Sequence, residues 1–187
     1  MTASLHSFFS YQFRAPGCGV SGPIRFAVGR SVNDLVLAAR SQDGICALFL
    51  GDDAAALRDQ LDQAFPGMAL TEDNRALSHD LHQIIAFLDK GAADAMIPLD
   101  VGGTAFQQAV WRALCDIPCG QTRSYTELAL SLGVPRAVRA VGGACAANVL
   151  AVAIPCHRVV RSDGAISGYR WGVARKRARL ANEAMQG

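Results

Sequence analysis

The chain has 187 residues, of which 51% are hydrophobic and 18% are charged, and these proportions are typical of a globular protein that can bury a core. No apolar run is long enough to span a bilayer, and the N-terminus lacks the pattern of a secretory signal, so we expect a cytoplasmic protein with no membrane partner. Six cysteines without a CxxC pair predict reduced thiols rather than a disulfide framework.

Charge is distributed unevenly along the chain. Residues 1–103 carry 7 basic and 12 acidic side chains, whereas residues 104–187 carry 11 basic and 4 acidic ones. Ten of those eleven basic residues are arginines, which suit planar, bidentate contact with phosphates and bases. An ordinary solvated basic face has the same composition, so charge alone only indicates that the two halves face different partners.

The first half reads as a compact α/β scaffold domain over residues 1–95. Its first twenty residues show no clear period, and we expect a loosely docked start. Short apolar runs predict three strands of a small antiparallel sheet, at Ile24–Val28, Leu35–Ala39 and Ile45–Leu50. Apolar residues at helical spacing predict two helices that cover the sheet, at Ala54–Phe65 and Arg75–Leu88.

The glycines and the proline of residues 96–103 predict a linker, followed by a mostly helical domain over residues 104–187. Thr104 and Gln107 form a capping-box pattern that starts its first helix. His79 and His82 lack a partner of metal-ligand type, so we expect neither a metal site nor a cofactor.

A helix-turn-helix pattern follows. Ser124 and Glu127 form a second capping box for a helix that ends at Leu132, and Gly133 can take the left-handed turn before a helix from about Arg136 to Ala147. Plain helical packing would give the same pair of helices.

The second helix of this pair has an unusual composition. Arg136 and Arg139 are its long polar side chains, and its remaining candidate DNA-binding residues are small: Ala137, Ala140, Gly142 and Gly143. Such a surface can approach duplex DNA closely yet read little of its sequence. The adjacent glycines further predict that something packs hard against that backbone.

A candidate nucleophile lies in Ile154-Pro155-Cys156-His157-Arg158, after an apolar segment that we expect to be short and buried, with Ile154 biased toward extended geometry. Pro155 restricts the backbone on both sides, and His157, Arg158 and Arg161 can supply the base or positive charge that a thiol needs to become a thiolate. A buried structural cysteine beside a surface histidine is the alternative interpretation.

Four motifs occur in the order and spacing of a known family: Arg139-Ala-Val-Gly-Gly-Ala, Asn148, Ile-Pro-Cys156-His157-Arg158-Val-Val and Ser-Gly-Tyr169. The chain resembles the O6-alkylguanine-DNA alkyltransferases, also called methylated-DNA–protein-cysteine methyltransferases. The likeness is closest to the C-terminal half of the bacterial adaptive-response protein. The cysteine-rich zinc domain of that protein is absent from this sequence, so phosphotriester repair and transcriptional activation are not expected.

The resemblance implies roles for catalytic residues. Cys156 would accept the alkyl group, His157 would activate it through a bound water, and Glu183 would orient His157. Asn148 resembles a hinge asparagine that ties the recognition helix to the active-site segment, and Tyr125 resembles the tyrosine that rotates the 3′ phosphate and contacts the guanine. Taken singly, Asn148 as a helix cap and Glu183 as a surface residue remain open.

The resemblance also implies how the lesion is held. Arg139 would fill the gap left by the extruded nucleotide, Tyr169 would form a pocket wall against the base, and the backbone of Val159 would help to read it. Arg170 stands where other members have small residues, which leaves acceptance of bulky groups open.

The activity so implied is direct reversal of DNA damage in the bacterial cytosol. A methyl or small alkyl group would pass irreversibly from O6 of guanine, and from O4 of thymine, in double-stranded DNA to Cys156, and the protein would act as a monomer. The implied folds are ribonuclease H-like for the first domain and a winged-helix-like helix-turn-helix for the second. A lesion-binding protein that accepts no alkyl group, and a thiol hydrolase, are the competing hypotheses.

Overall fold

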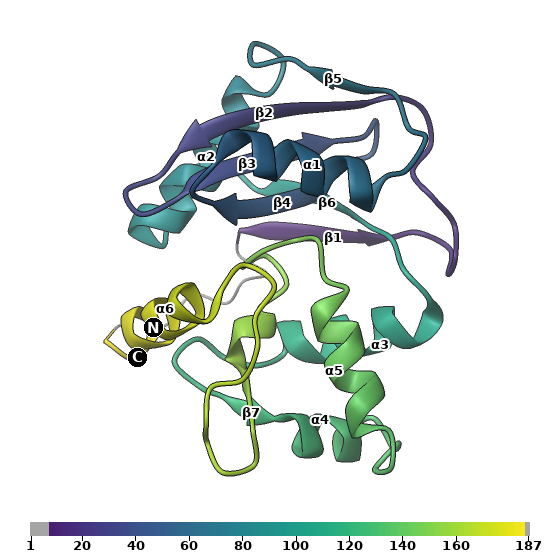
Figure 1. The fold of residues 1–187 in the computed structure, drawn as a ribbon, viewed down its shortest axis with the longest axis vertical. Helices are drawn as coiled ribbons and strands as arrows, with labels where there is room; N and C mark the ends of the chain where they lie inside the picture. The colour runs from purple at the N-terminus through teal and green to yellow at the C-terminus, as the bar shows by residue number, and fades with distance from the viewer. Residues whose placement is uncertain (1–7, 186–187) are drawn as a thin grey trace. The chain divides into compact units, whose positions relative to one another are not determined.

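The computed structural model describes residues 8–185 in two compact units, residues 8–102 and residues 103–185 (Figure 1). Residues 1–7 of the predicted first domain lie outside the described residues. Across residues 8–185, no helix has both the length and the apolar character needed to cross a membrane.

The first unit is built on a six-stranded mixed sheet. Its strands, in spatial order, are β1 (Phe9–Phe13), β6 (Ile97–Val101), β4 (Ile45–Gly51), β3 (Leu35–Arg40), β2 (Ile24–Arg30) and β5 (Leu70–Glu72). The three predicted strands are confirmed as the antiparallel β2, β3 and β4. The prediction of a small antiparallel sheet is wrong, because β6 pairs in parallel with β1 and β4, and β5 pairs in parallel with β2.

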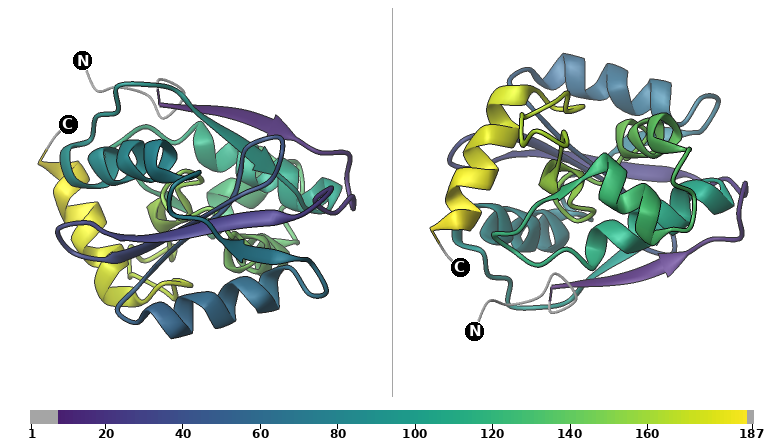
Figure 2. Two further views of the ribbon diagram at one scale, coloured as in Figure 1. Left: turned by 90° about the horizontal axis from the view of Figure 1, so that it is seen from above. Right: turned by 90° about the horizontal axis from the view of Figure 1, so that it is seen from below.

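Two helices, α1 (Ala54–Ala64) and α2 (Ser78–Lys90), cover opposite faces of this sheet (Figure 2). Because both faces are covered, β4 is buried along almost its whole length, which explains its continuous apolar sequence. At Gly29 in β2, a Cβ atom would come within 2.8 Å of Leu81 in α2, so the helix approaches the strand closely there.

The sequence missed β1 and β6 at one edge of the sheet and β5 at the other. Residues 97–101, predicted as part of a linker, form β6, and the units divide after Gly102. Asp100 in β6 is 1% exposed, forms an ion pair with Arg14 at 2.8 Å and accepts a 2.6 Å hydrogen bond from Ser41. The predicted loose start is also wrong for β1, where Phe9 packs edge-on against Phe87 with ring centres 4.9 Å apart.

The second unit is mostly helical, as predicted. Its helices are α3 (Ala105–Cys115), α4 (Tyr125–Ser131), α5 (Val138–Ala146) and α6 (Val173–Ala184). Two short strands, β7 (Arg123–Ser124) and β8 (Val159–Val160), pair in parallel. Strand β8 directly follows a 3₁₀ helix, η2 (Cys156–Arg158). The capping box at Thr104 is confirmed, and Trp111 of α3 donates a 2.8 Å hydrogen bond to the carbonyl of Ala144 in the core.

The α4–α5 pair shows the predicted helix-turn-helix order. The Ser124 capping box is confirmed, and Gly133 adopts φ +72° after α4. The backbone N–H of Gly133 donates to Leu130 and that of Val134 donates to Ala129, which is the Schellman arrangement for ending a helix. α5 begins at Val138, two residues later than predicted, because the Ala137 N–H first closes a turn on Val134.

Candidate active site

The segment that leads to Cys156 is folded into tight turns. The N–H of Ile154 donates to Leu150, and the N–H of Cys156 donates to Ile154 across Pro155, whose φ of −83° and ψ of 57° make an inverse γ-turn. Burial of the segment, as predicted, is confirmed. Val152 adopts φ +64°, a conformation that costs a β-branched residue about 1–3 kcal/mol and persists only where surrounding contacts enforce it.

Asn148 provides those contacts. It is fully buried just after α5, and its side-chain amide donates to the carbonyls of Ile154 (2.9 Å) and Leu150 (3.3 Å). Its side-chain oxygen accepts from the N–H of Leu150 at 2.8 Å. The same amide nitrogen lies 3.3 Å from the sulfur of Cys156. The Asn148 side chain thus holds both ends of the turn from Leu150 to Ile154. It also directs a hydrogen-bond donor at the sulfur of Cys156.

His157, Glu183 and Arg158 form a buried network beside Cys156. Nε2 of His157 lies 2.8 Å from Oε1 of Glu183. Arg158 donates to both oxygens of the same carboxylate, at 2.9 and 2.8 Å, and to the carbonyl of Ile117 at 2.6 Å. The fork of Arg158 therefore holds Glu183 in the orientation that meets the histidine.

This network sets the protonation of His157. Burial lowers the pKa of His157, against the opposing effect of Glu183. Burial raises the pKa of Glu183, but hydrogen bonds from His157 and Arg158 outweigh it and bring that pKa to about 2. A carboxylate only accepts hydrogen bonds, so Nε2 of His157 donates to Glu183, and burial favours the neutral form of the ring. Its Nδ1 is buried and has no hydrogen-bond partner among residues 8–185, which leaves a lone pair for another proton.

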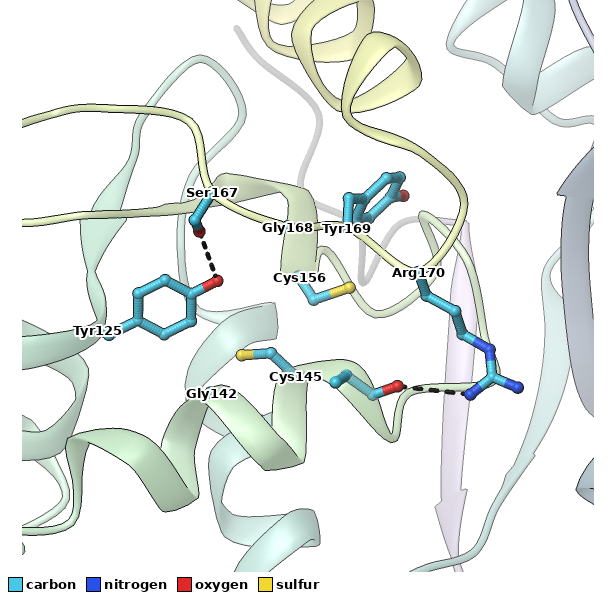
Figure 3. A pocket seen from close by; sticks show the side chains of 9 residues that line it. Tyr125, Gly142, Cys145, Cys156, Ser167, Gly168, Tyr169 and Arg170 are labelled. Carbon is cyan, nitrogen blue, oxygen red and sulfur yellow. Dashed lines mark hydrogen bonds between the residues drawn. The ribbon is translucent and has the colours of Figure 1, made fainter.

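A pocket of about 440 Å³ opens onto Cys156 (Figure 3). Helices α4 and α5 supply one side of it, and the loop that follows β8 supplies the other. Its lining residues are Tyr125, Gly142, Cys145, Ala146, Cys156, Ser167, Gly168, Tyr169 and Arg170. Pockets for small ligands have volumes of about 300–1,000 Å³, so this one has room for a purine base.

The thiol in this pocket is not ionised at rest. Burial raises the pKa of Cys156 to about 11, and the Asn148 hydrogen bond and the charges of Lys176 and Arg170 offset only part of that effect. The sequence had suggested Arg158 and Arg161 as the positive groups. Arg158 is instead committed to Glu183, and Arg161 is exposed and pairs with Asp163 at 3.9 Å.

Two functional candidates were missed by the sequence analysis. Lys176 is fully buried, and its Nζ donates to the carbonyl of Val159. It precedes Leu180 and Glu183 by four and seven residues, and this spacing on one helical face was a usable signal. The other is Cys145, which lines the pocket and whose pKa burial raises to about 12.

The solvent-exposed face of α5 carries mostly small residues, as its composition suggested. Arg139, Ala140 and Gly143 are exposed, whereas Val141 and Ala144 are buried. Nothing in the described structure lies within 4 Å of a Cβ placed on Gly143, so the expected tight packing is not made by protein atoms there. Gly142 faces the ring of Tyr125, which a Cβ would meet at 3.9 Å. Arg136 and Ala137 precede the helix rather than belong to it.

The structure brings most of the predicted site residues together, but not all of them into the pocket. Four of them line the pocket: Tyr125, Cys156, Tyr169 and Arg170. Three do not: Asn148 contacts the sulfur of Cys156, and His157 and Glu183 contact each other. The buried Val159 lies outside the pocket lining, and its carbonyl accepts from Lys176. Across residues 8–185, no three His, Cys, Asp or Glu side chains are placed to hold a metal ion together.

Comparison with known proteins gives consistent matches. Residues 105–185 match the family described as 6-O-methylguanine DNA methyltransferase, DNA binding domain. The chain is 39% identical over 132 residues to the inducible methylated-DNA–protein-cysteine methyltransferase of Bacillus subtilis, covering 69% of this chain and 74% of that protein. It is 49% identical over 173 residues to the bifunctional transcriptional activator/DNA repair enzyme Ada of Escherichia coli. That match covers 92% of this chain and 48% of Ada, so the chain spans about half the length of this relative.

Solved structures agree with the sequence matches. The crystal structure of Mycobacterium tuberculosis OGT in complex with DNA superposes with a TM-score of 0.72 and 33% identity, covering 87% of this chain and 94% of that one. The mixed sheet followed by helices is therefore a fold shared with that protein.

Proposed function

Because the chain belongs to the methylated-DNA–protein-cysteine methyltransferase family, we propose that it repairs alkylated DNA by direct reversal, with Cys156 as the acceptor of the alkyl group. The observation that carries this proposal is the placement of a thiol in a pocket of about 440 Å³. That thiol also has a hydrogen-bond donor, Asn148, and a neutral histidine next to it in the chain.

The reaction is a displacement at the alkyl carbon. The proton of the Cys156 thiol passes through a bound water to Nδ1 of His157, and Glu183 stabilises the charge that forms on the ring. The sulfur then bonds to the carbon while the bond from that carbon to O6 of guanine breaks. The electron pair goes to the base, and the Tyr125 hydroxyl supplies a proton to it. The phenol is restored when His157 gives up its proton.

The product explains why one molecule repairs one lesion. A thioether at Cys156 is not cleaved by water, whereas the thioester of a cysteine hydrolase is, and so the acceptor is consumed.

In duplex DNA the alkylated guanine is stacked between its neighbours and cannot reach a thiol inside a pocket, so the nucleotide has to leave the base stack. We infer that α5 approaches the duplex with its small outer residues and that Arg139 fills the space left by the nucleotide, with Arg136 on a phosphate. Little sequence preference follows, because these residues offer few side chains to base edges. We further infer that the first unit is ribonuclease H-like, and that α4, α5 and the β7–β8 pair form a winged-helix-like module. We also infer that the protein acts as a monomer.

Intact mass spectrometry tests the proposal. After incubation with duplex DNA containing O6-methylguanine, the protein should gain one methyl group, and fragment ions should place it on Cys156. The Cys156→Ser variant should gain none. Cys145→Ser is the matched control, because it removes the other thiol of the same pocket and should still end with one methyl group.

The same measurement separates the competing functions. Unmodified protein that still binds the lesion would indicate a binding module, and repeated turnover on an ester would indicate a hydrolase. Either result would overturn the acceptor assignment.

A further inference from the structure

A pair of hydroxyl groups closes one side of the pocket. The phenol oxygen of Tyr125 lies 2.9 Å from Oγ of Ser167, and both residues line the pocket that holds Cys156 (Figure 3). Tyr125 is the first residue of α4, and Ser167 belongs to the loop between β8 and α6. The contact therefore joins two segments 42 residues apart in the sequence.

The ring of Tyr125 faces Gly142 of α5, where the absent Cβ of the glycine would make only an ordinary contact with the ring, at 3.9 Å. The hydroxyl proton of the phenol can turn about the C–O bond. The direction of that proton then depends on the partner of the phenol oxygen, and here that partner is Ser167.

Only one arrangement of the pair leaves the phenol proton available. A tyrosine hydroxyl has one proton to donate and can also accept a hydrogen bond. If Tyr125 donates to Ser167, its proton is occupied; if Ser167 donates, the phenol proton can point to another acceptor. Donation by Ser167 also opposes the effect of burial, which raises the pKa of Tyr125.

We propose that Ser167 is a positioning residue for the alkyl transfer: its hydroxyl donates to the phenol oxygen of Tyr125 and directs the phenol proton toward the base held over Cys156. This inference rests on the proposed function, because it concerns the proton that the departing guanine receives. In this proposal Ser167 acts through Tyr125 and does not contact the base.

The same loop offers a matched control. Thr126, the next residue of α4, forms a hydroxyl pair with Ser162 at 3.1 Å, but this pair is exposed and neither residue lines the pocket. Ser162→Ala thus removes a bond of the same kind between the same two segments. Loss of loop attachment alone should affect Ser162→Ala and Ser167→Ala similarly, whereas loss of proton direction affects only Ser167→Ala.

The experiment measures the single-turnover rate of methyl transfer from duplex DNA containing O6-methylguanine. We expect Ser167→Ala to slow transfer about tenfold, as befits one neutral hydrogen bond in an acid-assisted step. Ser162→Ala should match the wild type, and Ser167→Thr, which keeps the hydroxyl, should recover most of the rate. In a Tyr125→Phe background, Ser167→Ala should have no further effect, because the proton it directs is gone.

Alkylation of Cys156 by iodoacetamide provides a second readout. Iodide leaves without a proton, so Ser167→Ala should not change the rate of this alkylation. A pocket distorted by the substitution would change it. Equal transfer by Ser167→Ala and the wild type would refute the positioning role. So would a tenfold loss that persists in the Tyr125→Phe background, or an equal loss with iodoacetamide. A wild-type protein that gains no methyl group would instead refute the proposed function itself, and with it this inference.

Discussion

Replacement of Glu183 by glutamine tests how the buried network contributes to stability. The Glu183 side chain is 14% exposed, and its pKa is about 2 against an ordinary value of 4.5. At about 1.4 kcal/mol per pKa unit, this difference corresponds to roughly 3 kcal/mol of folding free energy at neutral pH. Glutamine also leaves the guanidinium of Arg158, which is 4% exposed, without its charge partner. Breaking a buried pair from one side costs about 3–5 kcal/mol, so both arguments predict a loss of about 3 kcal/mol.

Urea unfolding followed by tryptophan fluorescence measures this loss in the full chain. The two tryptophans, Trp111 and Trp171, are both buried in the unit of residues 103–185, so their emission reports on that unit. Asp163→Asn is the control, because Asp163 belongs to an exposed ion pair in the same unit. Exposed pairs contribute about 0–1 kcal/mol, so this control should unfold close to the wild type.

The pH dependence gives the sign of the effect. The folded-state pKa of Glu183 lies below its unfolded value, so its stabilisation is complete above about pH 4.5 and is lost as the pH falls toward about 2. The wild type should therefore lose about 3 kcal/mol in this window that Glu183→Gln does not lose. An unchanged urea midpoint in Glu183→Gln, or the same acid-induced loss in both proteins, would refute the reasoning.

Three further predictions follow from exposed and buried groups. Arg139→Ala should slow methyl transfer in duplex DNA far more than reaction with free O6-methylguanine, since Arg139 is exposed on α5; equal losses with both substrates would contradict its role in nucleotide extrusion. Lys176→Met should raise the pKa of Cys156, because the lysine charge lowers it, and a slower reaction of Cys156 with iodoacetamide at about pH 8 is the measurement. Cys18 is exposed and should react with a disulfide reagent in the folded protein, whereas Cys46, whose pKa burial raises to about 12, should react only on unfolding.

Local signals in the sequence predicted local structure well. The capping boxes at Thr104 and Ser124, and the left-handed turn at Gly133, depend on residues within four positions of one another, and the structure contains each. The motifs around Cys156 likewise identified a region whose residues the structure brings together. Each of these features is specified by neighbours in the chain, which a reading of the sequence can see.

Features that depend on distant partners were missed. β6 contains Pro98 and a buried Asp100, and it reads as a linker because the ion pair with Arg14 and the hydrogen bond from Ser41 become visible only in the fold. Lys176 reads as one more basic residue of α6 until the carbonyl of Val159 is placed beside it. A buried charge needs an opposite charge or hydrogen-bond partners, and the partners of Asp100 and Lys176 lie far from them in the sequence.

The protonation state of the Cys156 thiol differs from the sequence-based prediction more than any of these features does. The sequence suggested a thiol activated by nearby positive charge, but with a pKa of about 11 only about one Cys156 in ten thousand is ionised at neutral pH. A permanently ionised thiol in an open pocket would react with any small electrophile or oxidant, and a protein that works once cannot recover from that reaction. Burial suppresses such reactions, and in the reaction that we propose His157 accepts the proton at the moment of attack. Selectivity for the lesion then follows from coupling of proton transfer to the arrival of a base, rather than from a reactive sulfur at rest.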